Sequence, residues 1–452
     1  MRTVPWLGAH AWASGEFPRS FVLVVLVFAF AFPVATASSA LAQNRVGLLG
    51  SGLGCQWATV GAAIGAASAA TPSTILIQAG HTFNERLGTI SKPVTIASSN
   101  AGCTAKVSSG AKARIDAGGV GRVATISDAV TFEYVELQGG AVTDEKGAGL
   151  LVTSTGDLIL DATNLTGGVL TLTLWHLTDL NAAGIQLEAG GTLVMQGNSG
   201  LFLNQAVSGW GSGGLVVEAG ATATLRDNAK IGALLLANIG HDVAGGALVR
   251  GTLILEDDAS IFGNSAGLTG GVQVYGGTLE LRDRARIAAN SGRRAGGVLA
   301  YFGAHVFTAE GATPAILDDN GGVDGGGLTI QDATAELEGI EVSDNASDSC
   351  GAGILIEHES ASLTLENAQI RDNRADTCGG GIAVLEGELD LETSDLTGNI
   401  AGKDGGGTLP RGSRQHRRPG GVARERRLGR CARRRHRAAL WRLVDAHRCR
   451  RA

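Results

Sequence analysis

The feature that most constrains the fold of this chain is a motif repeated through its second half. Each copy has an aliphatic residue, two free positions, an Asn, a short spacer, and then Gly-Gly and an apolar stretch, as in residues 370–384. The Asn residues of the eight copies are Asn204, Asn238, Asn264, Asn290, Asn320, Asn345, Asn373 and Asn399, and the closing glycines are Gly214, Gly246, Gly271, Gly297, Gly327, Gly353, Gly381 and Gly407. Successive closing glycines are 25 to 32 residues apart. A period of this size is typical of a solenoid, a propeller or another array.

Within each period, apolar and polar residues alternate, as in residues 277–283 and 386–392. Alternation indicates strands with one buried face, and no repeat offers an amphipathic helix. A propeller blade needs four strands and roughly 40–50 residues, so this period is too short for one. We therefore predict an all-β parallel β-helix of about 12 coils over residues 43–407, with the regular repeats at about 200–407.

The repeated Asn and Gly residues have a structural explanation in such a coil. Both residue types tolerate the left-handed backbone conformation, so we expect them at tight corners. Asn side chains at equivalent places in successive coils would also stack into an internal ladder that satisfies their amide groups. The alternative is a polar binding stripe on the surface, which we consider the weaker explanation.

The N-terminus has the pattern of an export signal. Residues 21–32 are apolar and follow Arg19, and Ala40-Leu41-Ala42 supplies a cleavage site with small residues. We predict a signal peptide over residues 1–42, and no transmembrane segment in the mature chain. An uncleaved anchor is the alternative, although the apolar run stops at Pro33 and is short for a membrane span. The predicted location is extracellular or at a bacterial cell surface or outer membrane.

A short helix is predicted after the signal. Trp57, Val60, Ile64 and Ala67 recur at helical spacing in an Ala-rich run, which indicates a helix over about residues 56–69. Such a helix would cap the first coil, whose open strand edges would otherwise be exposed.

Export also makes disulfides plausible. Cys350 and Cys378 occupy the same place in adjacent repeats, so stacking would bring their Cα atoms to about 5 Å. Cys55 and Cys103 bracket the first strands and are a second suspected pair. The alternative is four small buried thiols. No Cys-x-x-Cys spacing or His cluster accompanies them, so we expect no metal.

Charge is divided unevenly along the chain. Residues 43–407 carry a net charge of −21, residues 408–452 carry +14 and residues 1–42 carry +1. An acidic coil repels nucleic acid and anionic membranes, so we expect no nucleic-acid partner for residues 43–407.

The repeat pattern breaks after Gly407, where an Arg-rich tail over residues 408–452 replaces the expected apolar strand. One explanation is a genuine basic tail that binds an anionic surface. The other is a reading-frame shift in a GC-rich gene, which the break inside a motif favours. In both cases we expect the tail to be disordered.

Two segments carry a resemblance to known families. Residues 55–64, 75–80 and 92–96 resemble the opening of bacterial right-handed β-helix proteins of the pectin-lyase-like superfamily. The repeats resemble those of polymorphic outer-membrane proteins, in which Phe-x-x-Asn is followed by Gly-Gly-Ala-aliphatic. Here residues 261–264 and 245–248 carry the two halves, but Ile, Leu or Val replaces the Phe in every copy. The resemblance implies a right-handed coil and an exported surface protein of an adhesin-like kind, with surface glycans among its partners.

The pectin-lyase-like fold also implies an enzymatic alternative, a polysaccharide lyase or glycoside hydrolase. That chemistry needs clustered carboxylates and a basic residue. The candidates are Asp257, Asp258, Asp318, Asp319, Arg282, Arg284 and Arg286, which the pattern places at strand ends or on outward positions. The platforms that bind sugars are usually aromatic, and residues 43–407 hold only Trp57, Trp175, Trp210, Tyr134, Tyr275 and Tyr301 from the Trp and Tyr classes.

The histidines offer no metal-ligand spacing; they are His81, His176, His241, His305 and His358. We therefore assign no catalytic, cofactor-binding or metal-binding residue. The sequence favours a non-catalytic structural or adhesin-like rod, and leaves its ligand and oligomeric state open.

Overall fold

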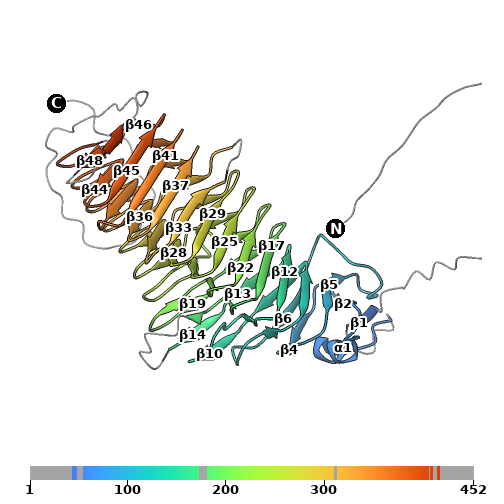
Figure 1. The fold of residues 1–452 in the computed structure, drawn as a ribbon. Coiled ribbons are helices and arrows are strands. Elements are labelled where there is room, and N and C mark those ends of the chain that lie inside the picture. The colour runs from blue at the N-terminus through green and yellow to red at the C-terminus, as the bar shows by residue number, and fades with distance from the viewer. Residues whose placement is uncertain are drawn as a thin grey trace, which may run out of the picture. The chain divides into compact units, whose positions relative to one another are not determined.

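The computed structural model describes residues 43–47, 54–172, 181–309, 313–406, 408–410 and 415–417. These residues belong to one compact unit, residues 41–452. Its strands lie side by side in three long sheets, and successive turns of the chain stack in sequence order (Figure 1). Two of the long sheets contain 12 strands and the third contains 14 in the described part of the chain. The predicted all-β parallel β-helix of about 12 coils is confirmed.

One turn shows how the chain winds. It runs through β24 (Ala247–Val249), β25 (Thr252–Leu255), β26 (Ser260–Phe262) and the short β27 (Ser265–Ala266). The next strand, β28 (Val272–Tyr275), then pairs in parallel with β24. Each turn thus contributes one strand to each long sheet.

The long sheets are named here for later reference. Sheet A contains β1 (Gln43–Val46), β2 (Ser73–Gln78), β5 (Val94–Ser99), β8 (Ala129–Glu133), β12 (Asp157–Asp161), β17 (Thr192–Gln196), β22 (Thr222–Leu225), β25, β29 (Thr278–Leu281), β33 (His305–Thr308), β37 (Thr334–Glu338), β41 (Ser362–Glu366), β45 (Glu388–Glu392) and β49 (Gln415–Arg417). Sheet B contains β3 (Thr82–Asn84), β6 (Ala113–Asp116), β9 (Val135–Gln138), β13 (Asn164–Thr166), β18 (Gly200–Phe202), β23 (Lys230–Ile231), β26, β30 (Arg286–Ala288), β34 (Ile316–Asp318), β38 (Glu341–Ser343), β42 (Gln369–Arg371) and β46 (Asp395–Thr397). Sheet C contains β4 (Gly88–Ile90), β7 (Ala124–Ile126), β11 (Leu150–Val152), β16 (Ile185–Leu187), β21 (Leu215–Val217), β24, β28, β32 (Val298–Tyr301), β36 (Leu328–Gln331), β40 (Ile354–Glu357), β44 (Ile382–Val384) and β48 (Thr408–Pro410).

Short strands form smaller sheets between sheets B and C. They are β10 (Ala141–Thr143), β14 (Val169–Thr171) and β19 (Gln205–Ala206); β15 (Asn181–Ala182) and β20 (Gly211–Ser212); and β27, β31 (Ser291–Gly292), β35 (Gly321–Gly322), β39 (Ala346–Ser347), β43 (Arg374–Ala375) and β47 (Ile400–Ala401).

The core is a column of stacked aliphatic side chains. In sheet A, for example, Leu253, Leu279 and Val306 pair in register and are fully or almost fully buried. Burial of such a side chain contributes about 1.5–3 kcal/mol to the free energy of folding. In sheet A, strand alternation sends the residues between them outward, so this sheet has one apolar and one largely polar face.

The helix α1 (Val60–Ala66) is shorter than the predicted 56–69 and buries Val60, Ala63 and Ile64 in the core. Both of its ends are held by charged side chains of the next turn. Glu85 accepts hydrogen bonds from the backbone N–H groups of Val60 and Gly61 at 2.7 and 2.9 Å. At the other end, the Lys92 ammonium donates to carbonyls of residues 64, 65 and 67. These charges match the helix dipole at each end.

The corner before each repeated Asn departs from the prediction. In seven of the eight copies the left-handed residue is the one directly before the Asn, such as Asp319 or Asp344, and none of the eight Asn has a positive φ. The expected left-handed conformation is therefore wrong for the Asn. The residue directly before the Asn adopts the left-handed conformation instead, so the Asn side chain points inward.

The seven closing glycines among the described residues also avoid the left-handed region, and close packing explains them instead. A Cβ at Gly246 would lie 2.6 Å from the carbonyl oxygen of Gly271 and 2.6 Å from Cγ2 of Ile261. Both distances are far below a van der Waals contact. The next turn therefore approaches the backbone too closely for any side chain.

Both suspected cysteine pairs are confirmed as disulfides. The Cα atoms are 5.5 Å apart for Cys55 and Cys103 and 4.5 Å apart for Cys350 and Cys378. The second pair joins equivalent positions of adjacent turns, which also form a parallel bridge.

Strand pairing continues past the predicted boundary at residue 407. β48 pairs with β44, and β49 pairs with β45. The remainder of the predicted Arg-rich tail and the predicted signal peptide lie outside the described residues, as do Trp175 and His176.

Candidate functional site

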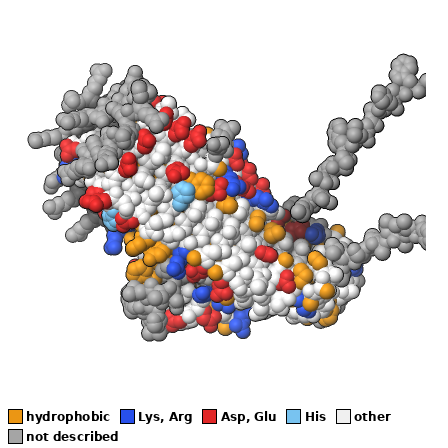
Figure 2. Space-filling model, viewed as in Figure 1, with side chains coloured by type: hydrophobic (Ala, Val, Ile, Leu, Met, Phe, Trp, Pro, Cys, Tyr) orange, Lys and Arg blue, Asp and Glu red, His pale blue; other side chains and the backbone are white. Residues whose placement is uncertain are grey.

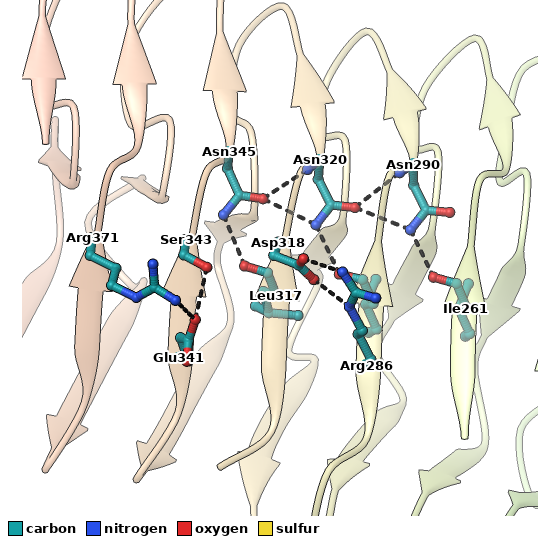
Figure 3. Close-up of polar contacts among 11 residues, drawn as sticks. Ile261, Arg286, Asn290, Leu317, Asp318, Asn320, Glu341, Ser343, Asn345 and Arg371 are labelled. Atoms are coloured by element: carbon teal, nitrogen blue, oxygen red, sulfur yellow. Dashed lines mark hydrogen bonds and ion pairs between the residues drawn. The ribbon is translucent and has the colours of Figure 1, made fainter. Parts of the chain in front are cut away.

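The repeated Asn residues form an internal ladder, as predicted, and all eight are buried. Figure 3 shows three rungs: Asn290, Asn320 and Asn345. The Oδ1 atom of Asn345 accepts hydrogen bonds from the backbone N–H and the side-chain Nδ2 of Asn320, at 3.0 and 3.1 Å. The Nδ2 atom of Asn345 in turn donates to the carbonyl of Leu317 and to Asn373, both at 2.9 Å. A ligand cannot reach these amides, so the ladder stabilises the fold and does not form a site.

Charged side chains lie on the outer face of sheet B and pair across turns. Arg286 on β30 makes a two-pronged contact with Asp318 on β34, with Nε 2.8 Å from Oδ1. Two turns later, Arg371 on β42 contacts Glu341 on β38, which also accepts a hydrogen bond from Ser343 at 3.0 Å (Figure 3). We call these two pairs, with the neighbouring Arg284–Asp258 pair, the ion-paired wall. It contains several of the acids and arginines that the sequence offers for catalysis.

Ion pairing shifts the pKa values of some side chains in the ion-paired wall. The hydrogen bonds from Arg284, 2.7 Å from each oxygen, lower the pKa of Asp258. The hydrogen bond to Asp318 raises the pKa of Arg286. In the pairs of Asp258 and Asp318, the arginine contacts both carboxylate oxygens. On the face shown in Figure 2, acidic and basic side chains both occur along the turns.

One carboxyl group behaves differently. The pKa of Asp344 is raised by desolvation and then by the nearby carboxylates of Asp319 and Asp372. All three are exposed corner residues with positive φ. Stacking of successive turns places like charges together at this corner.

The remaining catalytic candidates from the sequence lie at strand ends or on outward positions, as predicted. Asp257 and Asp319 have positive φ at corners. Arg282 pairs with Glu280 at 2.6 Å and with Glu256 at 3.0 Å on the outer face of sheet A.

A pocket of about 710 Å³ lies over the first strands of sheet C. Arg86 and Arg122 line it, and Arg122 donates to the carbonyls of Lys146 and Gly147. Burial lowers the pKa of Arg122, against the opposing effect of Glu145. Because Arg122 already holds the backbone of a neighbouring loop, its main role is structural.

The sequence interpretation missed an aromatic cluster at the turn from sheet C to sheet A. We call Tyr275, Tyr301 and Phe302 the aromatic corner. Their ring centroids are 4.9 to 5.0 Å apart, and the two tyrosine rings meet edge to face at 84°. The signal was present in the sequence, because the two tyrosines are one repeat apart.

Four of the five histidines considered as possible metal ligands fall within the described residues, and three of them have acidic neighbours. His358 lies 2.7 Å from Asp332, His241 lies 2.9 Å from Asp242, and His305 lies 3.8 Å from Glu336. Over the ranges that the structure describes, no three His, Cys, Asp or Glu side chains gather as a metal site. The same ranges contain no helix long and apolar enough to cross a membrane.

Comparison with known proteins gives no further guide to the site. No protein family, curated protein or solved structure matches this chain.

Proposed function

We propose that this chain is an exported, non-catalytic β-helix rod that acts at a cell surface as an adhesin-like protein. The resemblance to pectin-lyase-like coils and to polymorphic outer-membrane protein repeats supports this proposal at the level of sequence. The observation that carries it is the ion-paired wall. There Asp258 and Asp318, two of the four acids that the sequence offers for catalysis, are bound to arginines across turns.

Ion pairing of this kind does not suit acid–base catalysis. A general acid needs a pKa near the working pH so that it can hold and release a proton. An arginine that contacts both oxygens of a carboxylate stabilises the charged form and leaves no oxygen free for substrate. The ion pairs thus support a structural role for the ion-paired wall, which is to join successive turns.

Export is supported by the two disulfides. Disulfides persist in oxidising compartments and outside cells, and are rare in the cytosol. In this chain one links the first turns and the other links two adjacent turns near the C-terminal end of the described coils.

Two assays with the purified protein test this proposal, one for attachment to cells and one for cleavage of polysaccharide. We expect the protein to attach to intact cells in a pull-down, and to release no unsaturated or reducing ends from a panel of polyuronates. Reproducible turnover would overturn the non-catalytic assignment. Failure to attach to any cell or extracted surface fraction would overturn the adhesin-like role.

A second candidate, a polysaccharide-cleaving enzyme, is favoured by one observation: the raised pKa of Asp344 beside two other carboxyl groups. If that carboxyl were a general acid, Asp344→Asn would abolish turnover of polygalacturonate. The matched control is Asp348→Asn, four residues further on and also exposed. Turnover that survives Asp344→Asn would exclude this site.

A further inference from the structure

We propose that the aromatic corner is a binding platform for a neutral oligosaccharide. The inference rests on the proposed surface function and names the site and the ligand class through which that function would operate.

The first observation is strain at Phe302. Its φ is +56° and its side chain is 63% exposed. A bulky residue in the left-handed region is a genuine outlier. Register places Gly276, Asp332 and His358 at the same corner of the neighbouring turns, and all three have positive φ. These types are the ones that tolerate the conformation, so Phe302 is the exception in its row.

An exposed aromatic ring is not needed to fold this corner, because its neighbours fold the same corner with small or polar residues. Backbone strain that persists without a structural need is characteristic of functional sites. Here the strained backbone presents a ring at the surface, beside two others.

The rings are held in place before any ligand arrives. Tyr275 and Tyr301 meet edge to face, and the Tyr301 hydroxyl accepts a hydrogen bond from Nε2 of Gln273, which is buried. On the other side, the guanidinium of Arg250 lies 5.7 Å from the ring centroid of Tyr275. A ligand would therefore bind without a large cost for ordering side chains.

Polar side chains continue the platform on both sides of the rings. Strand register stacks Arg250, Tyr275, Tyr301, Gln331 and Glu357 in one row, since the pairs 249–274, 275–301, 301–331 and 331–357 are in register. Nε2 of Gln331 donates to Oε2 of Glu357 at 2.6 Å. Five residues thus offer a guanidinium, two phenols, an amide and a carboxylate along one line.

This combination matches the chemistry of a sugar. The C–H groups on one face of a pyranose ring are apolar and pack against an aromatic ring, while the hydroxyls at its edge need hydrogen-bonding partners. The row spans four interstrand spacings, or about 19 Å, which is enough for a short oligosaccharide.

Charge favours a neutral ligand over an acidic one. Residues 43–407 carry a net charge of −21. Within the row the charges are paired, Arg250 with Glu218 and Glu357 with Arg294, so the field at the platform is that of the whole acidic coil. A polyuronate would be repelled by this field, whereas a neutral glycan would not.

The experiment measures binding of the full-length exported protein to cellotetraose, maltotetraose, mannotetraose and N-acetylated chitotetraose, with trigalacturonate as the acidic comparator. Titration calorimetry gives the affinity, and saturation-transfer NMR identifies the sugar protons that face the rings. We expect at least one neutral tetrasaccharide to bind, with its ring C–H protons most strongly saturated, and trigalacturonate to bind at least tenfold more weakly.

Two variants test the site. We expect Phe302→Gly and Tyr275→Ala to weaken binding at least tenfold, while Phe262→Ala, a half-buried aromatic on sheet B, leaves it unchanged. Phe302→Gly should melt at the parent's temperature or above, because glycine relieves the left-handed strain, so loss of binding would not reflect unfolding.

Three outcomes overturn the inference. Binding that survives Phe302→Gly and Tyr275→Ala would place the ligand elsewhere. No binding of neutral tetrasaccharides by a parent protein that still attaches to cells would refute the platform but leave the adhesin-like role standing. A parent protein that self-associates, and that Phe302→Gly makes monomeric, would assign the rings to a second copy of the chain.

Discussion

Replacement of Asn345 by Ala tests the internal ladder most directly. The substitution removes four hydrogen bonds, two accepted by Oδ1 and two donated by Nδ2. The backbone N–H of Asn320 then loses its acceptor in a buried place, whereas Nδ2 of Asn320 keeps a bond to the carbonyl of Ile287. An unsatisfied buried donor costs about 1–3 kcal/mol, and the vacated volume adds to this. We expect local stability to fall by about 3 kcal/mol.

Hydrogen exchange followed by mass spectrometry is the right assay, because turns of a solenoid contact only their neighbours and a single melting temperature averages over them. A loss of about 3 kcal/mol predicts roughly hundredfold faster exchange in peptides that contain Asn320 and Asn345. Peptides from the first turns, around residues 60–100, should be unaffected.

The matched control is Asn228→Ala, since Asn228 is exposed and outside the ladder. It should change stability by less than about 0.5 kcal/mol. If Asn345→Ala exchanges and melts like the parent protein, the ladder does not carry the stability assigned to it, and neighbouring strands alone hold the turns together.

Three further predictions concern other parts of the coil. Gly246→Ala should destabilise the protein by more than about 2 kcal/mol in chemical denaturation, because its Cβ would meet the next turn. Gly65→Ala in α1, where a Cβ meets nothing, should be neutral or slightly stabilising. Equal effects of the two substitutions would contradict the close-packing explanation. Replacing both Cys350 and Cys378 by Ser should lower the free energy of unfolding by about 3 kcal/mol and make the melting of that end of the coil insensitive to reductant. An unchanged melting temperature would show that the disulfide adds no stability. Burial raises the pKa of Tyr301 to about 12, so the stability it contributes is complete below pH 10 and is lost as the pH rises through 12; ultraviolet titration should show one tyrosine ionising late, and Tyr301→Phe should remove that step.

Much of the fold could be predicted because it depends on the period of the sequence repeat and on the alternation of apolar and polar residues. Alternation marks the strands, and the spacing of Asn345 and its equivalents gives the length of a turn. Stacking then follows, since equivalent residues of successive turns must lie about 4.8 Å apart. The pairing of Cys350 with Cys378 is a direct consequence of that geometry.

What could not be predicted depends on which way particular side chains point. The sequence cannot show that the left-handed residue precedes the Asn, because Asp and Asn tolerate that conformation equally well. The aromatic corner was missed for a related reason. Tyr275 and Tyr301 lie on sheet C, where most outward residues are buried under a second layer. Only the coordinates show that the row containing these tyrosines reaches the surface.

The Asn ladder has a consequence for how such a chain can change over generations. The amides from Asn238 to Asn373 bond only to the adjoining rungs and to a carbonyl of the preceding turn. The bonds from Asn264 to Asn290 are the same in kind as those from Asn373 to Asn399, 26 residues apart in both cases. Unequal recombination between two such segments would delete or duplicate one whole rung and leave matching partners on both sides. The gene can therefore lengthen or shorten by complete units without inventing a new interior.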